Sequence, residues 1–287
     1  VYCEVVINGS YNGLYILQEN MKQGSDRIDV KKITAADNNY PEITGGYITK
    51  TDKTTGGDPV AWTMPSYIST QIVTFIHEWP KPENITNAQN NYIKAEFEKL
   101  SYMASTRNSS PESGYPSVID IPSFIDYMIL NEFSANADAY QYSTFYHKDR
   151  NGKLRAGPIW DTDLTYGYDL SRWGFDRSKY NTWQFSNGDN TGPLFWKDLF
   201  DDPVYRCYLT KRFNDLIQPG QPLNFSSVTS FIDSIVLTIN EASVRENQRW
   251  GTIPGFSGEI SKIKEFVRQR ISWMTTKLGT YSNCSNI

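Results

Sequence analysis

The chain has 287 residues, a formal net charge of −4 and 39% hydrophobic residues. This length and composition suffice for one large domain or two lobes around a substantial core. The small net charge gives no electrostatic footprint for nucleic acid or for an anionic membrane, so neither is an expected partner. No apolar run approaches the roughly 18 residues of a membrane-spanning helix. The chain starts at Val1 without a charged-then-apolar leader, and we expect it to be a mature or excised fragment.

The first part of the sequence predicts short strands. Residues 1–8 alternate in hydrophobicity, and a turn at Asn8-Gly9-Ser10 leads to a second alternating run at 14–18, which predicts a β-hairpin. Two further short strands are predicted at 27–33 and 46–51, so the first 60 or so residues are expected to form a small antiparallel sheet. Residues 52–65 contain Gly56-Gly57-Asp58-Pro59 and are expected to be a loop.

Helical periodicity dominates from residue 84 onward. Asp120 and Pro122 are typical of a helix start, and Ser257 is the expected N-cap of the last helix. The predicted helices cover 88–105, 120–133, 202–217, 228–242 and 260–278. Between them, the glycine- and aromatic-rich stretch 166–192 is too irregular to assign and is expected to be a functional loop.

Cysteine and histidine content argues against several site classes. The three cysteines include no CxxC pair, which supports neither a zinc site nor a disulfide scaffold, although a bridge between Cys3 and Cys284 stays open. The only histidines are His77 and His147, and no HExxH motif accompanies them, so a histidine-rich zinc site is excluded.

The stretch from Asn131 to Gly167 holds three aspartates, Asp138, Asp161 and Asp163, which are candidates for a catalytic or metal-binding site. Residues 140–146 are expected to form the first strand of a β-hairpin, and residues 154–160 are expected to form its second strand. Asn151-Gly152, between them, is typical of a tight turn. Such a hairpin would bring Asp138, before its first strand, close to Asp161, after its second. The expected cofactor of such a site is a divalent cation with a phosphate.

Magnesium bound to phosphates takes one or two protein carboxylates and keeps several waters. Residues i and i+2 of an extended segment point the same way, so Asp161 and Asp163 are predicted to face the metal together. The plainer interpretation is a pair of capping aspartates at a turn. A glycosidase-like alternative also stays open, because Asp138 and Asp161 could flank a sugar in a chain rich in Trp and Tyr.

Four segments resemble the CotH family of atypical, secreted protein kinases first known from bacterial spore coats. They read INGSYNGLYILQENM, LNEFSANAD, YHKDRNGKLRAGPIWDTDLTYG and FVRQRISWM, and the WDxDxxxG element is the most specific of them. In that family a catalytic aspartate is followed by a hairpin and then by a metal-binding aspartate. The resemblance therefore implies Asp138 in the first role and Asp161, with Asp163, in the second.

The resemblance implies an α+β, two-lobed, atypical protein-kinase-like fold. Its parts are a small antiparallel β lobe over residues 1–75, expected to be incomplete, and a mainly helical lobe over residues 76–287 with the central hairpin that carries the carboxylates. The implied activity is transfer of the γ-phosphate of Mg²⁺-bound ATP to a Ser or Thr hydroxyl of a protein. The implied location is extracytoplasmic, secreted or at the surface of a bacterial cell. The main alternative is a catalytically inactive CotH-like module for extracellular binding or surface assembly.

Two features depart from a protein kinase. Kinases place a metal-binding Asn five residues after the catalytic aspartate, and this chain has Ser143 there, with Asn131 or Asn136 as possible substitutes. The phosphate-orienting lysine is also ambiguous: Lys50 and Lys22 are candidates, with Glu19 as the ion-pair partner, although each lysine could equally be a surface residue. The chain contains no GxGxxG, GxxxxGK[ST] or HRD motif, so only the resemblance indicates a nucleotide.

Overall fold

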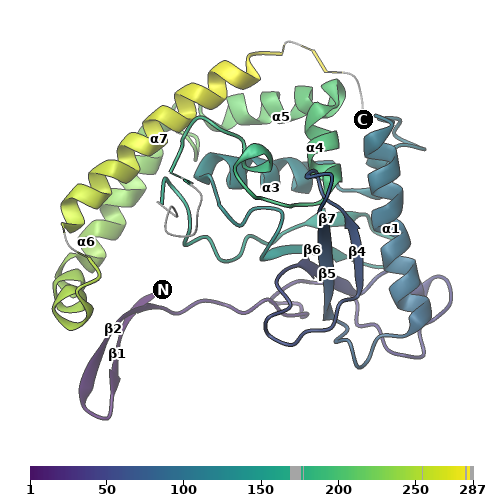
Figure 1. The fold of residues 1–287 in the computed structure, drawn as a ribbon, viewed down its shortest axis with the longest axis horizontal. Coiled ribbons are helices and arrows are strands. Elements are labelled where there is room, and N and C mark those ends of the chain that lie inside the picture. Colours follow the sequence, from purple (N-terminus) through teal and green to yellow (C-terminus); the bar gives the residue numbers. More distant parts are fainter. Residues whose placement is uncertain (169–175, 177, 254, 282, 285–287) are drawn as a thin grey trace.

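A computed structural model describes residues 1–168, 176, 178–253, 255–281 and 283–284. The fold is α+β, as predicted (Figure 1). Its central feature is a five-stranded antiparallel sheet in the order β4-β5-β3-β6-β7. The strands are β3 (Tyr47–Thr51), β4 (Trp62–Pro65), β5 (Ile72–Trp79), β6 (Thr144–Lys148) and β7 (Leu154–Ala156). The predicted central hairpin is therefore part of the same sheet as strands from the N-terminal region.

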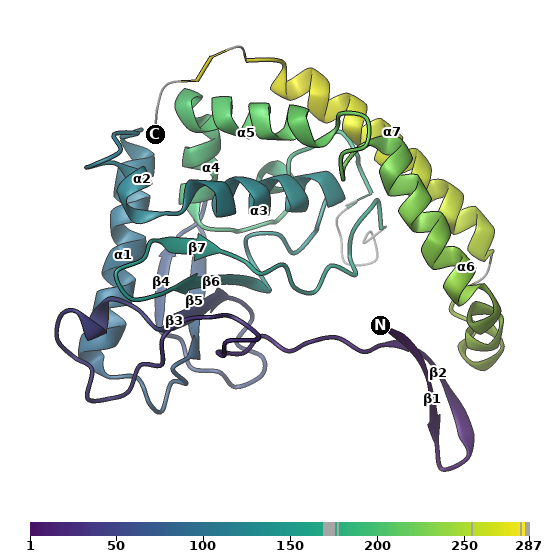
Figure 2. The ribbon, with the colours of Figure 1, turned by 180° about the vertical axis from the view of Figure 1, so that it is seen from behind.

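Several of the described helices lie next to this sheet, whereas the last two run side by side and extend away from it (Figures 1 and 2). The helix predicted to start at Asp120 does so, because the Asp120 carboxylate accepts a hydrogen bond from Ser123 N and a proline follows at the first turn. The helices are α1 (Asn87–Ser105), α2 (Tyr115–Val118), α3 (Ile121–Ser134), α4 (Leu194–Asp201), α5 (Pro203–Leu216), α6 (Phe225–Trp250) and α7 (Phe256–Leu278). In the described part of the chain, no helix combines the length and the apolar character needed to cross a bilayer.

One face of the sheet carries most of the hydrophobic core. Aromatic side chains from β5, α1, β6 and α4 meet there at ring-centroid distances of 4.9–6.3 Å, and such pairs stabilise the core beyond the area that they bury. They include Phe75, Phe97, Tyr146, Phe195 and Trp196. The opposite face carries a smaller cluster of Ile28, Val30, Ile48 and Phe145. One face of the sheet therefore packs against the main core, and the other is covered by the smaller cluster.

The first hairpin, β1 (Tyr2–Ile7) and β2 (Ser10–Ile16), forms as predicted but is a separate two-stranded sheet. Both views place it at the end of α6, away from the five-stranded sheet (Figures 1 and 2). The Arg245 guanidinium donates to both carboxylate oxygens of Glu4 at 2.7 Å, and Trp250 Nε1 donates to the carbonyl of Asn12 at 2.8 Å. Side chains of α6 therefore hold the hairpin.

Several local predictions were wrong. Residues 27–33 are not a strand: Ile28 makes only an isolated bridge with Gln23, although Ile28, Val30 and Ile33 are buried. Strand β4 lies inside the expected loop 52–65, where Trp62 and Met64 point into the core. The last helix begins earlier than expected, with Gly255 as its N-cap, so Ser257 lies inside α7.

The predicted boundary at residues 75/76 falls inside β5, and the sheet joins strands from both sides of it. The main core cluster likewise runs from Ile33 to Leu278. Of the expected functional loop 166–192, residues 169–175 and 177 lie outside the described residues.

Cysteine pairing differs from the sequence expectation. A disulfide joins Cys207, on α5, to Cys284, beyond the end of α7, across a sequence separation of 77 residues. Cys3 lies on β1 and is not its partner. The sequence-based argument missed this bridge because pairing depends on which elements the fold brings together, and α5 packs against α7.

Candidate functional site

The end of α3 sets the position of Asp138. The helix terminates at Ala135, which adopts a left-handed conformation with φ 50°. The next turn is held by Asn136, whose Oδ1 accepts a hydrogen bond from Asp138 N at 3.1 Å and whose Nδ2 donates to Asn131 Oδ1 at 2.9 Å. The carbonyl of Asp138 accepts from Tyr142 N at 3.0 Å. Asp138 is thus half-buried in a turn fixed on both sides.

The two asparagines considered as substitutes for a kinase metal ligand have other roles. Asn131 and Asn136 are 2% and 5% exposed. Asn131 Nδ2 donates to the carbonyl of Tyr127 at 2.9 Å, while its oxygen accepts from Asn136. Their amide groups therefore shape the turn that carries Asp138.

The predicted hairpin forms, with different details. Strand β6 begins only at Thr144, since Tyr140 (φ 67°) and Ser143 (φ 48°) are left-handed and interrupt the expected alternation. Residues 149–153 connect β6 to β7, and Asn151 has φ 55° within that loop. The loop is therefore longer than the predicted two-residue turn.

The hairpin brings the ends of the predicted site together. Ser143 Oγ donates to Asp161 Oδ2 at 3.3 Å, across 18 positions of sequence. Ala137 N donates to the carbonyl of Leu164 at 3.2 Å, and Tyr166 N donates to the carbonyl of Ser134 at 2.7 Å. The segment that follows the WDTD motif therefore runs beside the segment that leads into Asp138.

Asp161 does not lie in an extended segment. Its φ is 58°, so the argument that places Asp161 and Asp163 on one face by alternation does not hold at this position. Both carboxylates are solvent-exposed. The left-handed residues Ala135, Tyr140, Ser143, Asp161 and Tyr166 all lie in this region. Such conformations cost free energy in non-glycine residues and persist where the surroundings fix them, as they do in binding sites.

The C-terminal motif packs against both of these segments. The Phe266 ring on α7 contacts Tyr166 at 6.5 Å between centroids, and a Cβ at Gly167 would come within 2.7 Å of that ring. Four residues later, Arg270 Nη2 donates to Glu132 Oε2 at 3.1 Å. The LNEFSANAD, WDTDLTYG and FVRQRISWM segments thus meet in space although they span 130–274.

The sequence model of the CotH kinase protein family matches residues 1–274. The chain belongs to this family. A search among curated proteins gives no match. Three of the four segments that resemble the family in sequence meet near Asp138 and Asp161, whereas most of INGSYNGLYILQENM belongs to the hairpin that α6 holds.

The residues expected to orient the phosphates, Lys50, Lys22 and Glu19, do not form the predicted ion pair. We call this group and its neighbours the cation side of the candidate site. Glu19 forms an ion pair with Arg27 at 2.6 Å, not with a lysine, and its side chain is 72% exposed. Lys22 is exposed. Lys50, on β3, has a side chain only 14% exposed, and its nearest carboxylates belong to Asp52 (3.3 Å), Glu78 (3.7 Å) and Asp58 (3.8 Å).

Lys50 lies on the sheet face that carries the smaller apolar cluster. Its ammonium is 5.8 Å from the centroid of the Phe145 ring, to which Lys50 is also paired across the strands. Trp160, the residue before Asp161, packs against that same cluster. Lys50 and the WDTD motif therefore border one apolar surface. Glu78, on the adjacent strand β5, lies near the Lys50 ammonium but pairs more closely with Lys81, at 2.6 Å.

A cavity of about 360 Å³ opens next to this surface. One wall comes from the extended segment after β2, with Glu19, and the other from Trp160. The lining residues are Gln18, Glu19, Asn20, Met21, Asp26, Arg27, Ile28, Pro158, Ile159 and Trp160. Apolar and polar residues contribute equally to the lining, and the charged ones are Glu19, Asp26 and Arg27. Small-molecule sites combine apolar walls with a few polar groups in this way.

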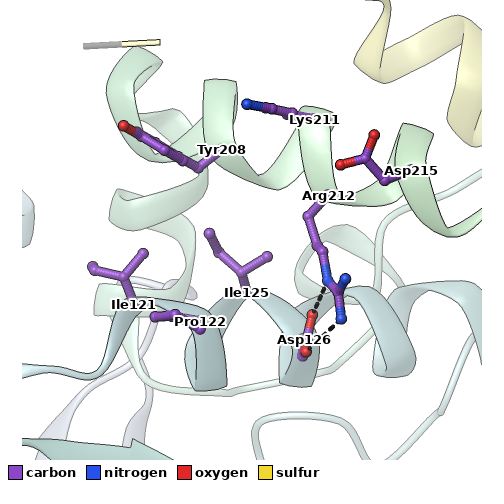
Figure 3. A pocket seen from close by; sticks show the side chains of 8 residues that line it. All are labelled: Ile121, Pro122, Ile125, Asp126, Tyr208, Lys211, Arg212 and Asp215. Carbon is purple, nitrogen blue, oxygen red and sulfur yellow. Dashed lines mark hydrogen bonds and ion pairs between the residues drawn. The ribbon is translucent and has the colours of Figure 1, made fainter. Parts of the chain in front are cut away.

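A second cavity, of about 450 Å³, lies between α3 and α5 (Figure 3). It is lined by Ile121, Ile125 and Tyr208, and the ion pair between Arg212 and Asp126 (2.8 Å) closes one side. None of the predicted site residues lines this cavity. It provides a matched control for experiments on the first.

Within the described residues, no group of three or more His, Cys, Asp or Glu side chains is arranged to hold a metal by itself. Magnesium that is bound together with phosphates takes only one or two protein carboxylates. Exposed Asp161 and Asp163 fit that requirement. Sequence reasoning assigned no role to Trp160 or Glu78. Glu78 comes near Lys50 through the pairing of β3 with β5, and Trp160 comes near it by packing against the smaller cluster. Ser143 was marked only as a departure from the kinase pattern, and its contact with Asp161 is new.

Proposed function

We propose that this CotH family member is a phosphotransferase that moves the γ-phosphate of ATP to a Ser or Thr hydroxyl of a protein. The contact between Ser143 and Asp161 carries the proposal, because it brings the loop of Asp138 to the WDTD segment across the hairpin. Asp138 accepts the proton of the acceptor hydroxyl, or orients that hydroxyl, from its turn after α3. Asp161, with Asp163, would hold Mg²⁺, which neutralises charge on the phosphates.

The nucleotide base would occupy the 360 Å³ cavity beside Trp160, in which Met21 and Ile28 offer apolar contact. Lys50 would orient the phosphates, and Glu78 would hold its ammonium, as the lysine–glutamate pair does in protein kinases. Arg27 lines the cavity itself and is the alternative cation for the phosphates. A two-lobed arrangement of the site, with the sheet above the nucleotide and the helices below, is part of this proposal.

We further propose an extracytoplasmic location. The bridge between Cys207 and Cys284 supports it, since disulfides persist in oxidising compartments and are rare in the cytosol. The family's association with spore coats agrees with such a location.

A second function has a specific observation in its favour. Three carboxylates surround Lys50, an arrangement that repels phosphate unless the loop carrying Asp52 and Asp58 moves. Together with Ser143 at the position of the kinase Asn, this favours a CotH-like binding or surface-assembly module without catalysis.

Calorimetry of ATP binding with and without Mg²⁺, followed by a radiolabel transfer assay on the chain itself and on casein, separates the two functions. A kinase binds ATP in a Mg²⁺-dependent manner and transfers label. Trp160→Ala should weaken ATP binding, whereas Tyr208→Ala, the same truncation at a half-buried aromatic of the α3–α5 cavity, should not. A folded wild-type protein that binds no nucleotide would overturn the kinase and leave the binding module.

A further inference from the structure

A buried ion pair lies next to the proposed site and has no part in the mechanism above. Arg270 is 0% exposed and Glu132 is 1% exposed. Arg270 uses all of its guanidinium nitrogens: Nε donates to the carbonyl of Glu132 (2.7 Å), Nη2 donates to its carboxylate (3.1 Å), and Nη1 donates to the carbonyls of Tyr180 and Thr182 (2.6 Å each). This one side chain therefore joins α7 to α3 and to the segment before η3 (Gln184–Ser186).

The Glu132 carboxylate is also fully engaged. Oε1 accepts from the Tyr140 hydroxyl at 2.9 Å, and Gln184 N donates to Oε2 at 2.9 Å. Together with Arg270, these donors compensate a charge whose burial alone would be costly. The network leads from α7 through Glu132 to Tyr140, which lies two residues after Asp138.

Tyr140 is the element of this network that the proposed site uses. It is fully buried, with its ring 5.0 Å from that of Trp196, and its backbone has φ 67°. A bulky residue holds this conformation only where its surroundings impose it. The hydroxyl bond to Glu132 and the ring contact with Trp196 provide two anchors. The direction of the chain between Asp138 and Ser143 depends on both of them.

We propose that Arg270 is a positioning residue for Asp138, acting through Glu132 and the Tyr140 hydroxyl. Arg270 fixes the Glu132 carboxylate, which in turn holds Tyr140 and the turn that carries Asp138. The inference rests on the proposed phosphotransferase function for its kinetic consequence. Its structural consequence, order in the 138–143 loop, can be measured without activity.

The sharpest variant is Tyr140→Phe, which keeps the ring against Trp196 and removes one oxygen. Tyr47→Phe is the matched control, because Tyr47 is also fully buried and its hydroxyl donates elsewhere, to the carbonyl of Ile43 at 2.8 Å. Arg270→Lys keeps the positive charge and removes the fork of donors. If Arg270→Lys fails to fold, Tyr140→Phe still tests the proposal.

Hydrogen exchange provides the activity-independent readout. Tyr140→Phe and Arg270→Lys should speed exchange of the Tyr142 amide, which bonds to the carbonyl of Asp138, whereas Tyr47→Phe should leave it unchanged. Unchanged exchange in both variants, or an equal change in the control, would overturn the positioning role. This outcome is independent of whether the wild type transfers phosphate.

With an active wild type, the kinetics add a second readout. Tyr140→Phe should lower kcat by about 10- to 100-fold while the KM for Mg-ATP stays nearly constant, because misplacing a catalytic group affects the chemical step more than binding. Tyr140→Phe combined with Arg270→Lys should lose little more than either change alone, since both act through one carboxylate. Multiplicative losses, or a raised KM with kcat retained, would contradict the proposal.

Discussion

The two sides of the proposed cleft are built in different ways. The side that carries Asp138 and Asp161 is anchored in the core: Glu132 and Arg270 are fully buried, and α7 contacts the end of the WDTD segment. On the opposite side, the pair between Glu19 and Arg27 is largely exposed to solvent. Core packing fixes the carboxylate side, whereas the pair between Arg27 and Glu19 on the cation side is exposed to water and salt, which weaken it.

The two sides should differ most in the free energy of unfolding when one arginine on each side is replaced by methionine. Arg270→Met leaves the Glu132 charge buried without its partner, so the free energy of unfolding should fall by about 3–5 kcal/mol. Arg27→Met breaks an exposed pair and should cost about 0–1 kcal/mol. Urea unfolding of the two variants measures both values. Similar losses would show that the two sides are held equally.

The disulfide joins α5 to the segment beyond α7. Replacing Cys207 and Cys284 by serine should lower the free energy of unfolding by about 2–4 kcal/mol, because the unfolded chain loses a long covalent loop. Cys3→Ser is the control and should change it little. Unfolding midpoints with and without reductant provide the measurement. A Cys207 variant as stable as the wild type would argue against the bridge.

The buried carboxylate also predicts a pH dependence. Burial raises the pKa of Glu132 to about 7, and Arg270 and the Gln184 amide oppose that rise. The folded state then holds this proton more tightly than the unfolded state, so its contribution to stability is full below about pH 4.5 and is lost as the pH rises to about 7. The stability of the wild type relative to Glu132→Gln should fall across that window by on the order of 2–3 kcal/mol. A rising or flat difference would contradict this protonation.

A smaller effect tests the cation side. If Lys50 orients the phosphates, Lys50→Met should weaken Mg-ATP binding by about tenfold, since a charge-assisted hydrogen bond contributes roughly 1.5–3 kcal/mol. Lys22→Met, at an exposed lysine, is the control. Calorimetry with Arg27→Met in the same series shows which cation matters. An unchanged affinity in Lys50→Met with a loss in Arg27→Met would assign the phosphates to Arg27.

The same contrast explains what the sequence could predict. Helix α3 and its Asp120 cap follow from local signals, and so do the first hairpin and strand β3. The hairpin that joins Asp138 to Asp161 is also local in character, because its strands are neighbours in the chain. These features need no knowledge of distant contacts.

Features that depend on distant contacts were missed. Residues 27–33 have the burial of a strand but no ladder, since they cover one face of the sheet without joining it. Cys207 finds Cys284 only because α5 and α7 pack together. Glu78 reaches Lys50 through strand pairing that no periodicity reveals. The left-handed conformation of Asp161 likewise depends on its surroundings. Because of it, the WDTD segment is not extended at this residue, and the expected alternation of side-chain directions does not apply.

The central claim is that Asp138 and Asp161 have different roles in one site. The direct test is Mg²⁺-dependent ATP binding by calorimetry, paired with phosphate transfer, for Asp138→Asn and Asp161→Asn. Asp126→Asn is the control, because this aspartate is ion-paired at the α3–α5 cavity. Asp161→Asn should lose both Mg-ATP binding and transfer, whereas Asp138→Asn should bind Mg-ATP like the wild type and transfer no phosphate. Binding of Mg-ATP by Asp161→Asn with wild-type affinity would contradict the claim.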